Sequence, residues 1–554
     1  MYLMNDDTIC APATVPGTGA ISVIRVSGGE ALPVVSAMVK CAPGREIMMA
    51  PGYSVRFGRI FLDDGELLDE VLVTVFRAPH SYTGEDSAEI SCHASKYIVD
   101  NVLHLLVEAG VRPAEPGEFT RRAYLNGKMD LAQAEAVADL IAAQGAAAHH
   151  LALSQLKGGF SNELKKMRGE LLNIVSLMEL ELDFSEEEVE FADRSQLSGL
   201  VDAVSGHIGR LISSFRLGNA IRNGIPVAIA GATNTGKSTL LNALLGEDRA
   251  IVSDVHGTTR DTIEETLNVG GLLFRFIDTA GIRRTDETVE QIGIERTFRK
   301  LEEAVVVFVM VDASLACSME AGVSDVGFSG GSHAGVPDAG FSGGFHAGVP
   351  AAGSGIGDSG NSSDSAVPSG SGDILLSGKD DYAGMTGQYD GAGNGVWRGV
   401  EDVLARVDVS RQKVIFVVNK MDRVTGMNAP APLAIRAGLD RLKASYHLQE
   451  SPEVYVSAKK GEGLDDLRMA LSEVCAEYAI SSDDVVVTNA RHIDALKNAR
   501  TSLARVQDGL HSGLPTDLVS QDIREAIYHI GSIVGEISTD EVLGNIFKNF
   551  CIGK

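Results

Sequence analysis

A glycine-rich segment in the middle of the chain has the residue types and spacing of a phosphate-binding loop. Gly231-Ala232-Thr233-Asn234-Thr235-Gly236-Lys237-Ser238 follows an apolar run at 226–230 and precedes a helix-forming run at 239–245. A strand, a glycine-rich turn and a helix N-terminus together present backbone N–H groups to phosphate oxygens. We expect Lys237 to reach the β- and γ-phosphates and Ser238 to ligate Mg²⁺.

Shorter motifs follow in the order expected of a GTP-binding domain. Switch threonines lie in 257–261 (GTTRD), and 278–281 (DTAG) supplies a metal aspartate and a glycine N–H for the γ-phosphate. In 419–422 (NKMD), Asp422 is expected to accept hydrogen bonds from guanine N1 and N2, and the backbone of 457–459 (SAK) to read guanine O6. Adenine offers no such donor pair, so the motifs predict a GTPase. The predicted nucleotide-binding residues are Asn234, Thr235, Gly236, Lys237, Ser238, Thr239, Thr258, Thr259, Asp278, Thr279, Ala280, Gly281, Asn419, Lys420, Asp422, Ser457, Ala458 and Lys459.

The residue after Gly281 excludes one known way of activating water. A Ras-like enzyme has a water-orienting glutamine at this position, and here it is Ile282. An apolar side chain cannot orient water, so another group must do so. The downstream carboxylates Glu287 and Glu290 are both candidates, and no arginine finger is identifiable from the sequence.

Composition indicates a globular chain of several domains. Its 554 residues exceed one domain, and 44% hydrophobic residues can build large cores. No apolar run reaches the roughly 20 residues of a membrane span, the N-terminus lacks a signal-peptide layout, and the six cysteines form no CxxC pair. These features predict a cytoplasmic protein without a membrane association. With a net charge of −27, any RNA contact should be local, through a basic patch such as Arg121, Arg122 and Lys128.

Changes of pattern along the chain predict its domains. Residues 1–125 mix β-type runs with Gly and Pro turns, which is typical of an α+β domain; residues 126–222 and 481–554 have helical spacing of apolar residues. Between them, 223–480 alternates strands and helices, as in a parallel sheet with helices on its faces. The predicted fold class is therefore multidomain, with an α/β P-loop (Ras-like) G domain inserted into an all-α domain.

One segment of the G domain differs from the rest. Residues 314–397 are dominated by Gly, Ser, Ala and Asp, and 327–337 is nearly repeated at 340–350. Such a composition buries too little apolar surface to offset its ordering entropy. We interpret it as a disordered surface insertion without a catalytic role.

Several motifs outside the G domain resemble one known family. The most specific is the C-terminal Phe550-Cys551-Ile552-Gly553-Lys554, and others lie at 81–86 (SYTGED), 116–123 (PGEFTRRA), 125–128 (LNGK), 130–135 (DLAQAE) and 292–295 (IGIE). Together with the domain order, they make the chain similar to the MnmE (TrmE) family of tRNA modification GTPases, over nearly its whole length except the insertion.

For the G domain, the resemblance implies a potassium-activated GTPase whose G domains dimerise in the transition state. The K⁺ ligands of the family fall on Asn234, Ser253, Val255 and Thr258, and Ser253 also counts among the nucleotide-binding positions. Mg²⁺ would be held by Ser238 and Thr259. The water-orienting glutamate matches Glu290, which would act as the catalytic residue together with Lys237.

For the N-terminal domain, the resemblance implies a folate-binding fold that forms a constitutive homodimer. A tetrahydrofolate derivative (5-formyl- or 5,10-methylene-tetrahydrofolate) would be the one-carbon donor, and the family's folate positions fall on Arg25, Glu89, Lys128 and Lys554. With the partner MnmG (GidA), which carries FAD, the family forms a heterotetramer that modifies the wobble uridine of tRNA. A catalytic role for Cys551 stays open.

The sequence departs from the family pattern at three places. The phosphate-binding loop reads ATNT between its glycines instead of RPNA, an arginine is missing near 16–19, and the 314–397 insertion is absent from typical members. The alternative function is a regulatory or ribosome-assembly GTPase, which the G domain alone would equally fit. Such a protein would not need the N-terminal domain or the C-terminal motif.

Overall fold

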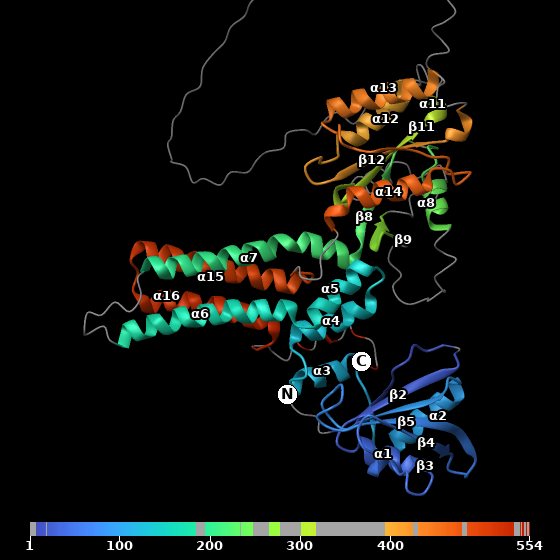
Figure 1. The fold of residues 1–554 in the computed structure, drawn as a ribbon, viewed down its shortest axis with the longest axis vertical. Coiled ribbons are helices and arrows are strands. Elements are labelled where there is room, and N and C mark those ends of the chain that lie inside the picture. The colour runs from blue at the N-terminus through green and yellow to red at the C-terminus, as the bar shows by residue number, and fades with distance from the viewer. Residues whose placement is uncertain are drawn as a thin grey trace, which may run out of the picture.

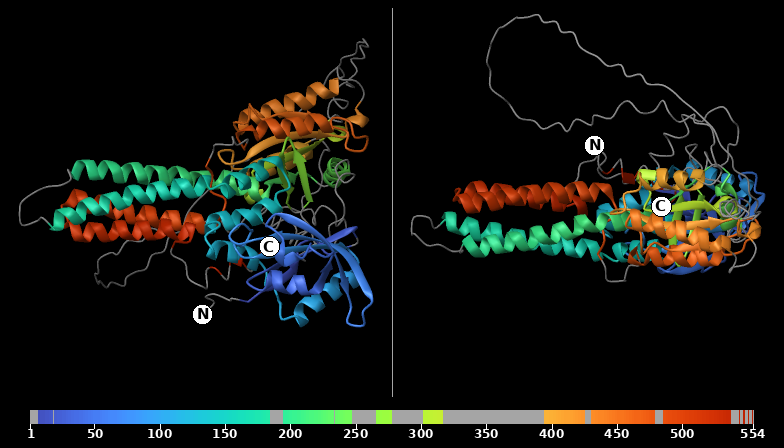
Figure 2. Two further views of the ribbon diagram at one scale, coloured as in Figure 1. Left: turned by 60° about the horizontal axis from the view of Figure 1, so that its bottom comes forward. Right: turned by 90° about the horizontal axis from the view of Figure 1, so that it is seen from above.

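The structure consists of three parts. The computed structural model describes residues 7–17, 19–183, 194–232, 234–246, 265–277, 301–316, 394–424, 430–478, 485–536, 543, 546–547, 550 and 553. Figure 1 shows an α+β domain, an elongated helical bundle and an α/β domain, and the views of Figure 2 show the bundle projecting away from the other two parts. This arrangement confirms the predicted multidomain fold class, with the α/β domain inserted into the helical one.

The N-terminal part is a seven-stranded sheet with helices packed on it. Its elements are β1 (Ile9–Pro12), β2 (Ile21–Ser27), α1 (Ala31–Met38), β3 (Val39–Cys41), η1 (Ile47–Met49), β4 (Ser54–Phe61), β5 (Leu67–Phe76), β6 (Ser87–His93), α2 (Lys96–Glu108), β7 (Arg112–Pro113) and α3 (Glu118–Leu125). The strand order is β3-β4-β5-β6-β2-β1-β7, and only β1 and β7 pair in parallel. Alternating apolar residues of the strands form one core with α1 and α2, so the opposite sheet face carries the polar positions discussed below.

Six helices from two distant stretches of the chain form the bundle. They are α4 (Leu131–Ala142), α5 (Ala146–Leu156), α6 (Gly159–Asp183), α7 (Arg194–Asn223), α15 (Ala490–Ser512) and α16 (Thr516–Val534). Helix α4 begins at a capping box, in which Asp130 and Gln133 satisfy each other's backbone N–H groups. Helix α15 packs against α7 and α16, and α16 packs against α6.

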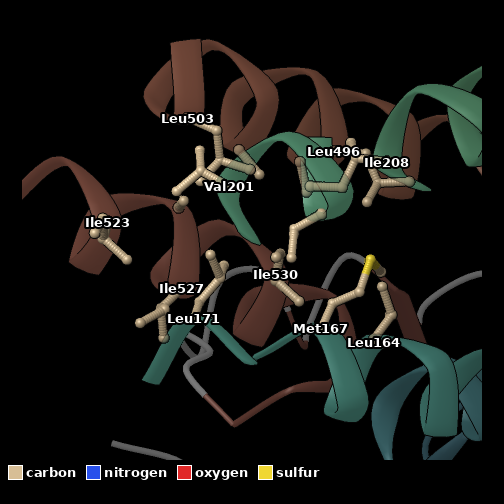
Figure 3. Packing of buried hydrophobic residues seen from close by; sticks show 14 of the residues in the cluster. Leu164, Met167, Leu171, Val201, Ile208, Leu496, Leu503, Ile523, Ile527 and Ile530 are labelled. Carbon is tan, nitrogen blue, oxygen red and sulfur yellow. The ribbon is translucent and has the colours of Figure 1, made fainter. Parts of the chain in front are cut away.

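A continuous apolar core holds the two stretches of the bundle together. Figure 3 shows Leu164, Met167 and Leu171 of α6 facing Ile527 and Ile530 of α16. Burying a side chain of this size stabilises a fold by roughly 1.5–3 kcal/mol. The helices before and after the α/β domain therefore form one folding unit.

The α/β domain is a six-stranded sheet with helices on both faces. Its elements are β8 (Ile225–Ala230), α8 (Lys237–Gly246), β9 (Glu265–Val269), β10 (Leu272–Phe276), β11 (Val306–Asp312), α11 (Ala313–Ala316), α12 (Asn394–Leu404), β12 (Lys413–Asn419), η5 (Met421–Arg423), α13 (Pro430–Ser445), β13 (Glu453–Tyr455), α14 (Leu464–Val474) and η6 (Ala476–Tyr478). The strand order is β13-β12-β11-β8-β10-β9, parallel except for β9. Parallel strands buried on both faces explain the nearly uniform apolar sequence of β11 and β12.

The predicted insertion ends earlier than its composition suggested. Helix α12 begins at Asn394, and Trp397, which is buried, packs against Gly438, where an added Cβ would lie 2.3 Å from the indole ring. Trp397 therefore belongs to the G-domain core and not to the insertion. The central part of the insertion, 317–393, lies outside the described residues.

The turn between β9 and β10 contacts the helical bundle directly. Ala147 N–H donates to the Gly271 carbonyl (3.1 Å), and Asn268 Nδ2 donates to the Gln144 carbonyl (3.0 Å). On the other side of the junction, an Arg216 guanidinium N–H of α7 donates to the Arg411 carbonyl.

Among the described residues, no helix is long and apolar enough to cross a membrane.

Candidate active site

The phosphate-binding loop follows β8 and ends in the first turn of α8. Gly236 has a φ of +95°, and a Cβ there would lie 2.4 Å from Asn419 Nδ2, so both the backbone conformation and the space require glycine. Asn234 also has a left-handed φ of +64° and is exposed, while Thr235 Oγ1 donates to the Ala232 carbonyl (2.9 Å). The predicted strand, loop and helix are thus confirmed, although Thr233 lies outside the described residues.

Lys237 lies with its ammonium group inside the curve of the loop. Its Nζ donates to the carbonyls of Gly231 and Ala232, both at 2.8 Å, and burial lowers its pKa. An ammonium group held at this position can exchange backbone carbonyls for phosphate oxygens of higher charge. Ser238 and Thr239 follow in the first turn of α8, where a helix N-terminus favours an anion.

Asn419 links the two loops predicted to bind opposite ends of the nucleotide. Its Nδ2 donates to the Thr235 carbonyl (2.9 Å), and its Oδ1 accepts from the Ala458 N–H (3.1 Å). The side chain is only 2% exposed, so these bonds form in a low dielectric. The structure therefore brings together the residues predicted at 234–239, 419–422 and 457–459 at the carboxyl edge of the sheet.

Asp422 presents an ionised carboxylate beside this linkage. Ser457 Oγ donates to Asp422 Oδ1 at 2.9 Å, and this hydrogen bond holds the pKa of Asp422 below its ordinary value. Ser457 itself is fully buried, which fixes the orientation of the carboxylate. A partly exposed, oriented carboxylate can accept two N–H bonds from a purine that carries donors at neighbouring positions.

One residue of this site was missed by the sequence analysis. Asp312 ends β11, is 2% exposed, and its Oδ2 accepts from Lys420 Nζ at 2.5 Å. Burial alone would raise the pKa of Asp312, but hydrogen bonds from Lys420 and Ser314 outweigh burial and lower it. The sequence indicated this position, because Asp312 ends an apolar strand. An aspartate at the end of a strand that pairs with the strand of Asn419 must lie at the same sheet edge.

The second predicted site lies on the sheet face opposite α1 and α2. Arg25 and Glu89 are cross-strand partners on β2 and β6, and the Arg25 guanidinium donates to Glu89 Oε1 through Nη2 (2.7 Å) and Nε (3.0 Å). The guanidinium also lies 5.4 Å from the ring centroid of Tyr82 and 5.6 Å from that of Phe119. A charged pair bordered by two aromatic rings can bind a flat polar heterocycle.

The C-terminal end of the chain reaches this second site. Arg25 Nη1 donates to the Gly553 carbonyl (3.4 Å), and a Cβ on Gly553 would lie 2.1 Å from the Pro12 carbonyl oxygen. Lys128 contacts the loop that carries Tyr82, because its Nζ donates to the Pro79 carbonyl (2.8 Å). The structure thus groups Arg25, Glu89 and the tail, with Lys128 on a neighbouring loop.

Twelve other predicted residues lie outside the described part of the chain. They are Ser253, Val255, Thr258, Thr259, Asp278, Thr279, Ala280, Gly281, Glu287, Glu290, Cys551 and Lys554.

The prediction of a basic patch at Arg121, Arg122 and Lys128 is wrong for its two arginines. Arg122 is buried, and its guanidinium pairs with Asp7 (2.7 Å) and Glu118 (3.1 Å). Arg121 pairs with Glu115 and Glu118. Because these carboxylates neutralise both arginines, Lys128, whose Nζ donates to the Pro79 carbonyl, is the one residue of the three without an ion pair in the described part of the chain.

Two family profiles and several known proteins match this chain. Residues 8–128 match the family profile described as the GTP-binding protein TrmE N-terminus, and residues 131–551 match the MnmE helical domain. The tRNA modification GTPase MnmE of Bacteroides thetaiotaomicron is 45% identical over 552 residues, and that of Flavobacterium johnsoniae is 42% identical over 553 residues; both alignments cover 100% of each chain. The protein of the same name from Porphyromonas gingivalis is 41% identical over 556 residues, with 100% of this chain and 99% of that chain covered.

Proposed function

Because the chain belongs to the MnmE (TrmE) family of tRNA modification GTPases, we propose that it hydrolyses GTP in the course of modifying the wobble uridine of tRNAs. The product would carry a 5-carboxymethylaminomethyl or aminomethyl group. The observation that carries the proposal is the joined nucleotide site, in which Asn419 bonds both to the phosphate-binding loop and to the 457–459 loop. The protein would act in the cytoplasm.

In the proposed reaction, this chain orients GTP and water. Asp422 and the backbone of 457–459 select guanine, while Lys237 and the loop N–H groups bind the β- and γ-phosphates. Ser238 and Thr259 would hold Mg²⁺, which would supply positive charge beside these phosphates. Asp278 would support the metal, the Gly281 N–H would suit the γ-phosphate, and Glu290 would orient the attacking water in place of the glutamine that Ile282 replaces.

A bound potassium ion would stabilise the transition state of GTP hydrolysis. The donor set of Asn234, Thr258 and the carbonyls of Ser253 and Val255 is neutral and oxygen-rich, which suits a monovalent cation. Asn234 fits this role because it is exposed at the tip of the loop, and no hydrogen bond of its side chain is found among the described residues. A cation there would offset charge that develops as the phosphate bond breaks.

Hydrolysis should therefore be roughly 10²-fold faster in KCl than in NaCl at equal ionic strength, because removing one electrostatic contact to a transition state slows a reaction by about this factor. Asn234→Gly should lose this difference while still binding GTP, because glycine adopts a φ of +64° without strain. Asn242→Ala, at an exposed asparagine of α8, is the matched control and should keep the difference. Phosphate release measures both rates, and equal rates of wild type in the two salts would reject the potassium site.

The second site is proposed to bind a tetrahydrofolate derivative, 5-formyl- or 5,10-methylene-tetrahydrofolate, as one-carbon donor. Glu89 would accept hydrogen bonds from the amino-pyrimidine edge, while Arg25, Lys128 and Lys554 suit the carboxylates of the glutamate tail. The aromatic rings beside Arg25 support binding of a flat heterocycle. FAD would be carried only by the partner, a protein of the MnmG (GidA) kind, in a heterotetramer with two copies of this chain.

An open apolar sheet face supports the proposed homodimer. Phe57 of β4 and Leu72 of β5 are register partners and are 53% and 49% exposed, and Val55 beside them is 53% exposed. They lie on the same face as Glu89, which is opposite the face covered by α1 and α2. Apolar side chains gathered on an open sheet face are typical of a surface covered by a second subunit.

A strain that lacks the protein should have lost the modified wobble uridines from its total tRNA, as measured by nucleoside mass spectrometry. Plasmid-borne wild type should restore them, and a Lys237→Ala variant should not, because it lacks the ammonium group for the γ-phosphate. Unchanged nucleosides in the deletion strain would reject the tRNA assignment and favour the alternative, a regulatory or ribosome-assembly GTPase.

A further inference from the structure

One side of the helical bundle carries positive charges that carboxylates do not neutralise. Several basic side chains of the bundle pair with Asp or Glu, as Arg505 does with Asp522 and Glu525, and Arg524 with Glu179. Near the junction of the bundle with the G domain, five exposed basic residues have no ion pair within the described part of the chain. They are Arg210 and Arg216 of α7, Lys497 and Arg500 of α15, and Arg411 before β12; we call them the basic strip.

Contacts connect the basic strip from α15 across α7 to the G domain, and Arg210 directly follows Gly209 on α7. Helices α7 and α15 lie side by side in Figures 1 and 2, and a Cβ on Gly209 of α7 would lie 3.9 Å from the guanidinium carbon of Arg500. Lys497 and Arg500 are three residues apart and so lie on one helix face. Arg216 donates to the Arg411 carbonyl, which joins the strip to the G domain.

The strip is open to a large partner. On α7 next to α15, a Cβ on Gly206 would meet nothing within 4 Å, and Gly209 contacts only Arg500. Two acidic residues lie near the strip. Asp408 is close enough to Arg411 and Arg216 for both to lower its pKa, although its bond from Ser410 lowers the pKa more, and the exposed Asp494 precedes Lys497 on α15.

We propose that the basic strip binds the phosphate backbone of the RNA substrate, an inference that rests on the proposed function. A protein of net charge −27 repels a polyanion over most of its surface, so RNA must approach where this field is locally reversed. Arginine and lysine on exposed helix faces suit phosphates without reading base sequence. The strip also borders the G domain, so bound RNA would lie across the junction between the bundle and the nucleotide-binding part.

The test compares two double variants of the full-length chain that remove equal charge. Lys497→Gln/Arg500→Gln removes two of the five positive charges of the strip, whereas Arg505→Gln/Arg524→Gln removes those of two paired arginines elsewhere on the same bundle. Glutamine preserves helix propensity in both variants. The fluorescence anisotropy of a labelled unmodified tRNA transcript is measured across a NaCl series without nucleotide. The strip variant should bind more weakly, and the slope of log K against log salt should fall by about 1 to 2. The control should keep the wild-type slope.

Four outcomes would overturn the proposal. One is a strip variant with the affinity and slope of wild type, and another is an equal loss in both variants. If the strip variant bound tRNA normally but failed to restore modified nucleosides in the deletion strain, the strip would instead bind a protein partner. A wild-type chain that binds no transcript would also overturn it, while the nucleoside analysis would still decide the proposed function independently.

Discussion

Replacing Asp422 by asparagine is expected to lower the affinity for GTP by at least about 10²-fold. Each hydrogen bond to a charged acceptor contributes about 1.5–3 kcal/mol, and tenfold in affinity corresponds to about 1.4 kcal/mol. Asparagine keeps one acceptor oxygen but turns an NH₂ group toward a second N–H donor of guanine. The proposed pair of charge-assisted bonds would therefore become one neutral bond and one donor–donor repulsion.

The same exchange should improve binding of xanthine nucleotides. Xanthine has a carbonyl where guanine has its amino group, and the asparagine NH₂ can donate to this carbonyl. Isothermal titration with GDP and XDP measures both changes. A reversal of base preference would separate altered recognition from a general loss of folding, because a misfolded site would bind neither nucleotide.

Asp408→Asn provides a matched control on the same domain. Asp408, which is exposed, is also a carboxylate that accepts from a serine hydroxyl, Ser410 Oγ at 2.6 Å, and its pKa is likewise lowered by that bond. It lies before β12, away from the Asn419 linkage, so its exchange should leave GDP affinity unchanged. Unaltered GDP affinity in Asp422→Asn would remove the proposed guanine contact.

Local motifs made the nucleotide site predictable, because their geometry is set within a few residues. Gly236 and Lys237 belong to a strand–loop–helix unit whose conformation the sequence specifies directly. Asn419 and Ser457 end neighbouring parallel strands, so the alternating pattern already placed them at one edge. The fold class followed from the same alternation and from the return of helical spacing after the G domain.

Features that depend on distant pairing were not predictable in this way. The partners of Arg122 show this, because Asp7 and Glu85, which lie before β1 and β6, pair with it from distant positions in the sequence. The bond between Arg25 and the Gly553 carbonyl spans 528 positions. Asp312 belongs to no motif, and only the register of β11 against β12 places it beside Lys420.

Removing the Glu135 carboxylate is expected to destabilise the helical bundle by about 3–5 kcal/mol, the usual cost of breaking a buried ion pair. Glu135 of α4 accepts from both Arg491 Nε and Nη2 at 3.1 Å and contacts His492 Nε2 at 2.6 Å. Arg491 also donates to the Ser532 and Ile533 carbonyls at the end of α16. One carboxylate thus ties the first helical stretch to both helices of the second.

This stabilisation should depend on pH in a defined direction. Burial alone would raise the pKa of Glu135, but His492 and Arg491 outweigh burial and lower it to about 2, from an ordinary value of 4.5. The contribution is therefore complete above pH 4.5 and is lost as the pH falls toward about 2. Glu135→Gln should lack this component, so its denaturant midpoint should differ from wild type more at pH 7 than at pH of about 3.

Glu179→Gln is the matched control for this experiment. Glu179 is also a glutamate of the bundle paired with an arginine, Arg524 of α16, but its side chain is 47% exposed. Exposed pairs contribute about 0–1 kcal/mol, so this variant should unfold near the wild-type midpoint in far-UV circular dichroism. Similar midpoints for the two variants at neutral pH would contradict a special role of Glu135. A large loss confined to Glu135→Gln would instead show that a single buried charge network couples the two chain stretches that flank the G domain.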